Sequence, residues 1–279
     1  MSLYKLLALD IDGTVLNSRG EVSPRVASAI AGARHAGMLV TLATGRSLRA
    51  ALPVAQALQI TAPLVVSNGA LVIAPASGRV LLKRVLPATI ATRAVQLLQR
   101  LGFTTFARRY CASGPDLFYE QGPAAAEQAC LLGQERDAVR QVFDLAGAVA
   151  TMEPLKVMTL DRTPAIEAAA AHLAGHMQGA YSLLITREMP GYSLLEVSAC
   201  GVSKATGLER LTALNSIHPH EVVAFGDNFN DLEMLQFAGL GVAMGNAPDP
   251  VKQAARVITA SNDEDGVAQV LEQYILQVA

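Results

Sequence analysis

Near its start the 279-residue chain reads Leu6-Leu7-Ala8-Leu9-Asp10-Ile11-Asp12-Gly13-Thr14, an apolar run that passes directly into a pair of carboxylates. An unbroken apolar run of this kind is typical of a central parallel strand that helices cover on both faces. Asp10 and Asp12 lie two residues apart, so on extended backbone their side chains point to the same side. Because an unpaired carboxylate at a buried strand end is costly, the pair indicates a metal ion or another functional partner.

The segments that follow alternate between strand and helix. Ser23-Pro24 reads as an N-cap followed by proline in the first helical turn, and Gly37 closes that helix. This alternation predicts an α/β fold built on a doubly wound, Rossmann-like parallel sheet. Strands are expected at 6–9, 38–43, 64–66, 222–225, 240–244 and 257–258.

Between the third and fourth of these strands, the pattern changes to that of an inserted α+β domain with a sheet of its own. The predicted division assigns residues 1–84 and 192–279 to the catalytic α/β core and residues 85–191 to the inserted domain. Within the insertion, helices are expected at 88–100, 135–146 and 164–172, and strands at 104–109, 155–160 and 181–186.

Composition argues against several classes of protein. The formal net charge is −2 and no run of like charge occurs, so no nucleic-acid partner is expected. No apolar stretch reaches the roughly 20 residues that span a bilayer, and the apolar run before Asp10 is too short for a signal peptide. Three cysteines without CxxC spacing favour reduced thiols over a disulfide framework or a zinc site. We therefore expect a cytoplasmic protein without a membrane partner.

Polar side chains stand at three of the expected strand ends. Asp10, Thr44 and Asp227 each follow a buried strand, and ligands of open α/β sheets bind beyond the carboxyl ends of the strands. Lys204 lies at an expected helix start, where backbone N–H groups and the helix dipole also favour an anion. Carboxylates, a hydroxyl and an ammonium group gathered in this way can hold a divalent metal ion and a phosphate together, which points to phosphoryl transfer.

Four motifs together resemble those of the haloacid dehalogenase-like hydrolases. They are Asp10-Ile11-Asp12-Gly13-Thr14, Thr44-Gly45, Lys204 within Gly201-Val202-Ser203-Lys204, and Gly226-Asp227 with Asn230-Asp231. The large insertion between the second and third motifs resembles the Cof-type phosphatase branch, in which an α+β cap covers the active site. The resemblance spans nearly the whole chain, although the insertion itself carries no matching motif.

The resemblance implies a Mg²⁺-dependent phosphatase that acts on a small phosphorylated metabolite, such as a sugar phosphate or a phosphorylated cofactor. It implies that Asp10 is the nucleophile, which forms an aspartyl-phosphate, and that Asp12 is the general acid and then the general base. Mg²⁺ would be held by the carboxylates of Asp10 and Asp227 and by the backbone carbonyl of Asp12. Asp231 would orient this cluster. The implied phosphate-binding groups are the Thr44 hydroxyl, the backbone N–H groups of Ile11 and Gly45, and the side chains of Asn230 and Lys204.

Two other functions stay open at this level. One is a phosphomutase on the same scaffold, in which the aspartyl-phosphate returns to the substrate rather than to water. The other is a non-catalytic phosphorylation switch that resembles a response-regulator receiver, although such domains carry their phosphorylated Asp on a central strand and not in an opening DxDGT. The sequence defines neither the substrate nor the oligomeric state.

A few further residues are candidates for contact with the substrate. Asn68-Gly69 reads first as a turn, and a substrate contact from it stays open. Arg46 is expected to pair with an acidic neighbour rather than to touch the substrate. In the insertion the candidates for reading the leaving group are Arg108, Arg109, Arg187 and Tyr192, although each is expected first as an ordinary surface residue.

Overall fold

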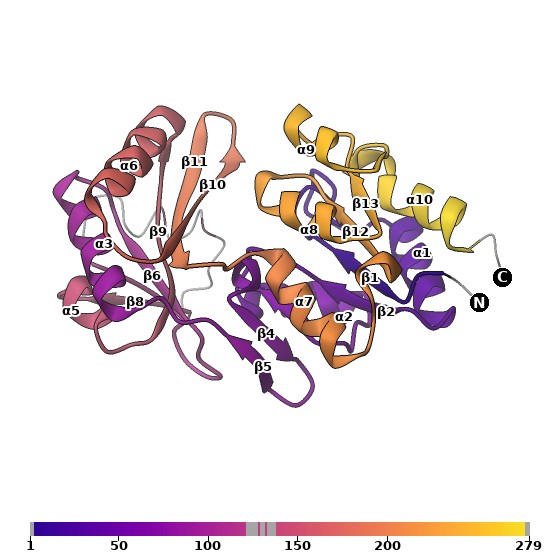
Figure 1. Ribbon diagram of the computed structural model, residues 1–279, viewed down its shortest axis with the longest axis horizontal. Coiled ribbons are helices and arrows are strands. Elements are labelled where there is room, and N and C mark those ends of the chain that lie inside the picture. The colour runs from indigo at the N-terminus through magenta and orange to yellow at the C-terminus, as the bar shows by residue number, and fades with distance from the viewer. Residues whose placement is uncertain (1–2, 121–127, 129–131, 133–137, 277–279) are drawn as a thin grey trace. The chain divides into compact units, whose positions relative to one another are not determined.

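The computed structural model (Figure 1) describes residues 3–120, 128, 132 and 138–276 of the chain. Its internal contacts divide it into two compact units. The core unit comprises Met1–Leu82 and Ser203–Ala279, and the second unit comprises Lys83–Val202. Each unit has its own sheet and its own buried cluster of apolar side chains.

The core unit is built on a five-stranded parallel sheet, as the alternation of strands and helices predicts. The strand order is β14-β13-β12-β1-β2, which places β1 between β12 and β2. These strands are β1 (Leu6–Leu9), β2 (Leu39–Leu42), β12 (Val222–Gly226), β13 (Leu240–Ala243) and β14 (Val257–Ile258). A bridge from Ala43 to Val65 attaches a smaller antiparallel sheet of β3 (Leu64–Val66), β4 (Leu71–Ala74) and β5 (Arg79–Lys83).

Helices bury both faces of the central sheet. The helices of the core are α1 (Pro24–His35), α2 (Leu48–Ala57), α7 (Lys204–Leu214), α8 (Leu232–Phe237), α9 (Asp249–Ala254) and α10 (Gly266–Tyr274). Leu6 and Ala8 of β1 pack in one cluster with apolar side chains of α7, α8 and α9. Leu7 and Leu9 alternate to the opposite face and are also fully buried. On that side α1 packs against β2 and against α10.

The second unit is a six-stranded sheet with the order β10-β11-β9-β6-β7-β8. Its strands are β6 (Phe106–Arg109), β7 (Leu117–Glu120), β8 (Val139–Val142), β9 (Pro154–Arg162), β10 (Tyr181–Met189) and β11 (Tyr192–Ala199). The helices α3 (Ala88–Arg100), α5 (Leu145–Val149) and α6 (Thr163–His176) pack their apolar side chains on one face of it. This unit is therefore an α+β layer with an independent core.

Two expectations for the second unit need correction, and one strand has no counterpart among the expected elements. The helix expected at 135–146 is wrong, because Val139–Val142 form β8, which pairs in parallel with β7. Strand β7 itself was not expected. The boundary expected after residue 191 comes too early, because Tyr192–Ala199 form β11, which pairs with both β9 and β10. In each case pairing with a distant strand overrides a local preference.

The structure also bears on membrane-spanning helices and on the cysteines. Among the helices of the described ranges, none has both the length and the apolar character needed to cross a bilayer. Cys111 and Cys200 are free thiols, and Cys130 lies outside the described residues.

Candidate active site

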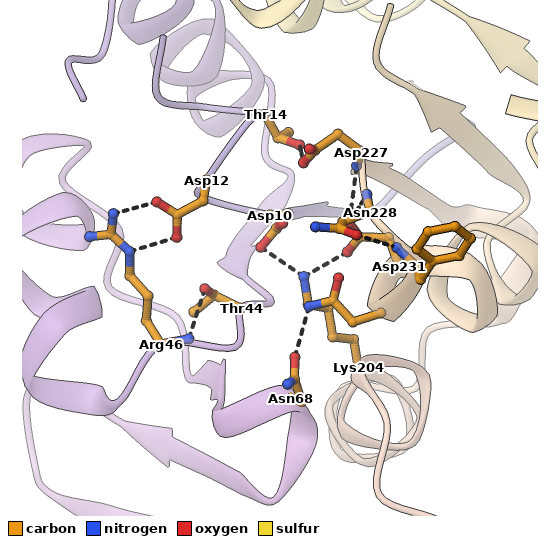
Figure 2. A network of polar contacts seen from close by, with 12 residues as sticks. Asp10, Asp12, Thr14, Thr44, Arg46, Asn68, Lys204, Asp227, Asn228 and Asp231 are labelled. Carbon is orange, nitrogen blue, oxygen red and sulfur yellow. Dashed lines mark hydrogen bonds and ion pairs between the residues drawn. The ribbon is translucent and has the colours of Figure 1, made fainter. Parts of the chain in front are cut away.

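The site lies where three neighbouring strands end. Asp10 directly follows β1, and Asp227 directly follows β12. Thr44 is the second residue after the end of β2. Because β1 lies between the other two and all three run in parallel, their carboxyl ends bring these side chains to one edge of the sheet. Figure 2 shows them grouped around Lys204, whose side chain approaches from another element.

Lys204 occupies the first position of α7. The preceding Ser203 caps this helix: its hydroxyl accepts from the Thr206 N–H at 3.3 Å, and the Thr206 hydroxyl accepts from the Ser203 N–H at 3.1 Å. The Lys204 side chain is fully buried, with Nζ 2.7 Å from Asp10 Oδ1 and 2.6 Å from Asp231 Oδ1. Burial opposes its charge, but the two carboxylates outweigh burial and raise the lysine pKa above its usual value.

Asp231 uses both of its carboxylate oxygens to hold its neighbours. Oδ1 accepts from Lys204, and Oδ2 accepts from the backbone N–H groups of Asp227 and Asn228, both at 3.0 Å. The residue is fully buried. Since its oxygens are committed in this way, Asp231 orients the lysine and the loop after β12.

Asp227 receives donors on both carboxylate oxygens. The Thr14 hydroxyl donates to Oδ1 at 3.0 Å, and Nδ2 of Asn246 lies 3.5 Å from Oδ2. Burial is the largest influence on this carboxyl group and, with the nearby negative charge of Asp231, raises its pKa to about 7. The Thr14 hydrogen bond acts in the opposite direction.

Asp10 is held in a buried and strongly negative environment. Its side chain is buried beside Lys204, and its backbone N–H donates to the Phe225 carbonyl of β12 at 3.1 Å. Burial, followed by the charge of Asp231, raises the pKa of Asp10 well above its usual range, while Lys204 acts to lower it. Further positive charge nearby would therefore favour the ionised form of Asp10.

The three acidic side chains fit a divalent cation. One oxygen atom from each of Asp10, Asp227 and Asp231 lies within 4.8 Å of the others. Three carboxylates face a single ammonium group there, which leaves net negative charge in a site of low dielectric. Hard cations such as Mg²⁺ prefer oxygen ligands of this kind. Asp231 has no exposed surface and its oxygens accept three bonds, so Asp10 and Asp227 are the carboxylates that would hold the ion.

Asp12 lies at the solvent edge of the group, where its side chain is 62% exposed. Arg46 holds it with two bonds, Nε to Oδ2 at 2.8 Å and Nη2 to Oδ1 at 2.5 Å. The hydrogen bond with Asp12 raises the pKa of Arg46. Arg46 therefore pairs with an acidic neighbour, as expected, and the partner is the predicted general acid.

The remaining predicted phosphate-binding groups lie on three loops. The Thr44 hydroxyl accepts from the Arg46 N–H at 3.1 Å, which leaves its own proton for another acceptor. Asn230 Nδ2 donates to Asn68 Oδ1 at 3.0 Å, and Asn230 Oδ1 is buried without a partner. A Cβ on Gly45 would lie 3.1 Å from Asn68 Oδ1, so this loop passes close to that side chain.

The side chain of Ile11 is fully buried, which leaves its backbone as the part of the residue that could reach a ligand. Its carbonyl accepts from the N–H groups of Thr14, Val15 and Leu16, which closes the turn that carries Asp12. Gly13 has a φ of 71° in this turn, and a Cβ there would lie 2.3 Å from Asp227 Oδ2. The glycine is thus required both by its backbone conformation and by the approach of the carboxylate.

Sequence reasoning assigned no contact to Asn246 or Thr14, although both touch Asp227. Asn246 lies shortly after β13, the neighbour of β12 in the sheet. A polar residue just beyond an expected strand end could therefore have been predicted to lie near the site. Asn68 was expected only as a turn with an open substrate contact. In the structure its side chain contacts Asn230, and its N–H donates to the Thr44 carbonyl at 2.9 Å.

The four candidates for reading the leaving group lie in the second unit and differ in their surroundings. Arg108 was expected at the surface, and this expectation is wrong, because the residue is only 5% exposed. It faces Asp116, with Nη1 3.5 Å from both carboxylate oxygens. Burial lowers its pKa. The guanidinium of Arg109 lies over the ring of Phe118. Tyr192 lies under the guanidinium of Arg162, and the side chain of Arg187 lies outside the described part of the structure.

A model of the family described as haloacid dehalogenase-like hydrolase matches residues 7–271. The chain belongs to this family. The superfamily expected from the four motifs is therefore confirmed, and so is the expectation of a hydrolase.

Individual relatives match along almost the entire chain. The Bacillus subtilis protein named 5-amino-6-(5-phospho-D-ribitylamino)uracil phosphatase YitU is 30% identical over 274 residues, which cover 96% of this chain and 97% of that protein. Pyridoxal phosphate phosphatase YbhA of Escherichia coli is 29% identical and covers 98% and 99% of the two chains. The crystal structure of a haloacid dehalogenase-like hydrolase from Bacteroides thetaiotaomicron aligns with a TM-score of 0.81 at 30% identity, over 97% and 99% of the chains.

Proposed function

We propose that this protein is a Mg²⁺-dependent phosphatase of small phosphorylated metabolites that works through an aspartyl-phosphate on Asp10. One observation carries the proposal: Asp10, Asp227 and Asp231 present oxygens within 4.8 Å of one another beside the buried ammonium of Lys204. This arrangement holds both a nucleophile and the positive charge that a phosphoryl group needs.

In the first step a carboxylate oxygen of Asp10 attacks phosphorus, and the bond from phosphorus to the ester oxygen breaks. Asp12 gives its proton to the departing alcohol. For this, the Asp12 carboxylate must first leave its two bonds with Arg46 and take up a proton from solvent, and its exposed position permits both.

In the second step Asp12, now a carboxylate, takes a proton from a water molecule. The water oxygen attacks phosphorus, and the bond to Asp10 breaks, which releases inorganic phosphate and restores the enzyme. Lys204 keeps Asp10 oriented through both steps because Asp231 anchors the ammonium from the other side. The Thr44 hydroxyl, Asn230 and the backbone N–H groups of Ile11 and Gly45 are proposed to donate to the phosphoryl oxygens.

Bound Mg²⁺ would neutralise charge on the phosphoryl oxygens as the phosphoryl group is transferred. Asp10 and Asp227 would hold it with their carboxylates, together with the backbone carbonyl of Asp12. Two relatives are named for phosphorylated small molecules, a ribitylaminouracil phosphate and pyridoxal phosphate. These names support a metabolite of this size as the class of substrate.

The nucleophile is tested by the substitution Asp10→Asn. We expect phosphate release to fall by at least about 1,000-fold, because the amide cannot attack phosphorus. Circular dichroism should show an unchanged fold. Asp249→Asn is a matched control, since Asp249 is an exposed residue in the first turn of α9, and it should keep full activity. Unchanged kcat in a folded Asp10→Asn protein would refute the assignment.

The reaction class is tested by phosphate release from a panel of phosphorylated metabolites, with Mg²⁺ and with EDTA. Metal-dependent release of inorganic phosphate would support a phosphatase. Isomerised substrate in the presence of a bisphosphate activator, without free phosphate, would instead identify a phosphomutase.

A further inference from the structure

Asn246, three residues beyond the end of β13 at Ala243, links two parts of the proposed metal site. Its Nδ2 donates to the carbonyl of Gly13 at 2.8 Å and lies 3.5 Å from Asp227 Oδ2. The first distance is that of a full hydrogen bond, and the second is at the limit of one. Asn246 therefore joins the turn after Asp12 to the carboxylate that follows β12.

The orientation of this amide is set from its other end. Asn246 Oδ1 accepts from the backbone N–H of Asn262 at 3.1 Å, so the amino group must face Gly13 and Asp227. Asn262 in turn donates through its own Nδ2 to the Leu16 carbonyl at 2.8 Å. Two asparagines thus connect the loop after β13 and the segment at Asn262 to both sides of the turn at Gly13.

The carboxylate of Asp227 is confined on the side of this turn. A Cβ on Gly13 would come within 2.3 Å of Oδ2, and the Thr14 hydroxyl holds Oδ1 at 3.0 Å. Asp227 also experiences the negative charge of Asp231, which favours movement away from the cluster. Donors on this outer side oppose that movement and preserve the orientation in which Asp227 faces Asp10.

We propose that Asn246 is a positioning residue that holds Asp227 and the Gly13 turn in the arrangement in which Asp227 and Asp10 share one divalent cation. The inference rests on the proposed function, because it concerns the same metal site. Residues that orient a ligand in this way commonly change metal affinity by about 10- to 100-fold.

The test is direct calorimetry of the full chain, freed of metal, with MgCl₂ and without substrate. Asn246→Ala and the similarly sized Asn246→Leu both remove the donor, and we expect both to weaken Mg²⁺ binding by about 10-fold or more. Asn262→Ala should weaken it less, because alanine keeps the backbone N–H that orients the amide of Asn246 and removes only the side-chain bond to the Leu16 carbonyl. Asn215→Ala is the matched control: Asn215 is exposed and donates to a backbone carbonyl, that of Leu211, at 2.8 Å.

Kinetics provide a second readout. In the Asn246 variants the Mg²⁺ concentration for half-maximal activity should rise while kcat at saturating Mg²⁺ falls much less. Mg²⁺ affinity within twofold of wild type in both variants would overturn the inference. Binding of Mg²⁺ by the wild-type chain would in that case still support the proposed metal site. If the wild-type chain itself binds no Mg²⁺ and releases no phosphate, the proposed function falls, and the inference falls with it.

Discussion

Lys204 is an ammonium group without exposed surface, held between Asp10 and Asp231. Removing it leaves two buried carboxylates facing each other, and loss of one partner of a buried ion pair typically costs about 3–5 kcal/mol. We expect Lys204→Ala to lose that much free energy of unfolding in urea at neutral pH without metal, in addition to its activity. Lys5→Ala serves as control, because Lys5 is 57% exposed in its pair with Glu221 and should leave the urea midpoint almost unchanged. Equal effects of the two substitutions would contradict this account of Lys204.

The raised pKa of Asp227, at about 7, should make the proposed metal binding depend on pH. A carboxyl group that binds its proton more tightly when folded removes stability from the metal-free protein as pH rises from about 4 to about 7. Mg²⁺ must displace that proton, so its affinity should increase with pH, by roughly tenfold between pH 6 and pH 8. The raised pKa of Asp10 acts in the same direction. Calorimetric titration in two buffers of different ionisation enthalpy would measure both affinity and proton release. Equal affinity at the two pH values would contradict the prediction.

At the scale of elements, the turn after β3 is tightly constrained by its backbone conformation and by a close contact. Ser67, Asn68 and Gly69 have φ values of 51°, 55° and 91° in succession. A Cβ on Gly69 would lie 1.9 Å from the Ser203 carbonyl oxygen, next to the start of α7. Gly20 has a similar φ of 76°, but nothing lies within 4 Å of its Cβ position.

Alanine at these two glycines separates backbone conformation from contact. Gly20→Ala should cost about 1 kcal/mol, the usual effect of a positive φ. Gly69→Ala must also displace the N-terminus of α7, and we expect it to lose at least about 3 kcal/mol and to reduce activity. Urea unfolding of both variants measures the difference. Similar losses would mean that the approach of Gly69 to Ser203 has little energetic weight.

Local signals in the sequence predicted the core elements well and the second unit less well. Strand β1 has the expected bounds 6–9, and α7 begins at Lys204, where a helix start is expected, because strand and helix-start signals act within a few residues. Strand β8 pairs with β7, with Leu117 opposite Val139. Pairing between separate segments is not visible in the local sequence of either one, so it was not predicted. The same holds in the site. Asp10 and Asp227 follow buried strands and were expected to meet, whereas the contact of Asn246 with Gly13 joins loops that are remote in sequence.

At the scale of the whole molecule, every residue assigned to the proposed catalytic and metal sites belongs to the core unit, Met1–Leu82 and Ser203–Ala279. The two core residues between which the second unit is inserted, Leu82 and Ser203, can be connected directly by a short linker. Arg210 Nε donates to the Leu81 carbonyl at 3.1 Å, so the end of β5 lies against α7, the helix that begins at Lys204. A flexible linker of about 10 Gly and Ser residues from Leu82 to Ser203 should therefore preserve the central sheet.

We expect this bridged core to unfold cooperatively, to bind Mg²⁺ and to hydrolyse a simple ester such as p-nitrophenyl phosphate. It should lose discrimination among phosphorylated metabolites, because the second unit contributes more than a hundred residues with a separate sheet and core but none of the proposed catalytic groups. Ratios of kcat/KM across the metabolite panel, compared between the full chain and the bridged core, measure this directly. If the bridged core binds Mg²⁺ and keeps the preferences of the full chain, recognition of the leaving group belongs to the core loops. If it binds Mg²⁺ but hydrolyses nothing, the second unit supplies part of the chemistry.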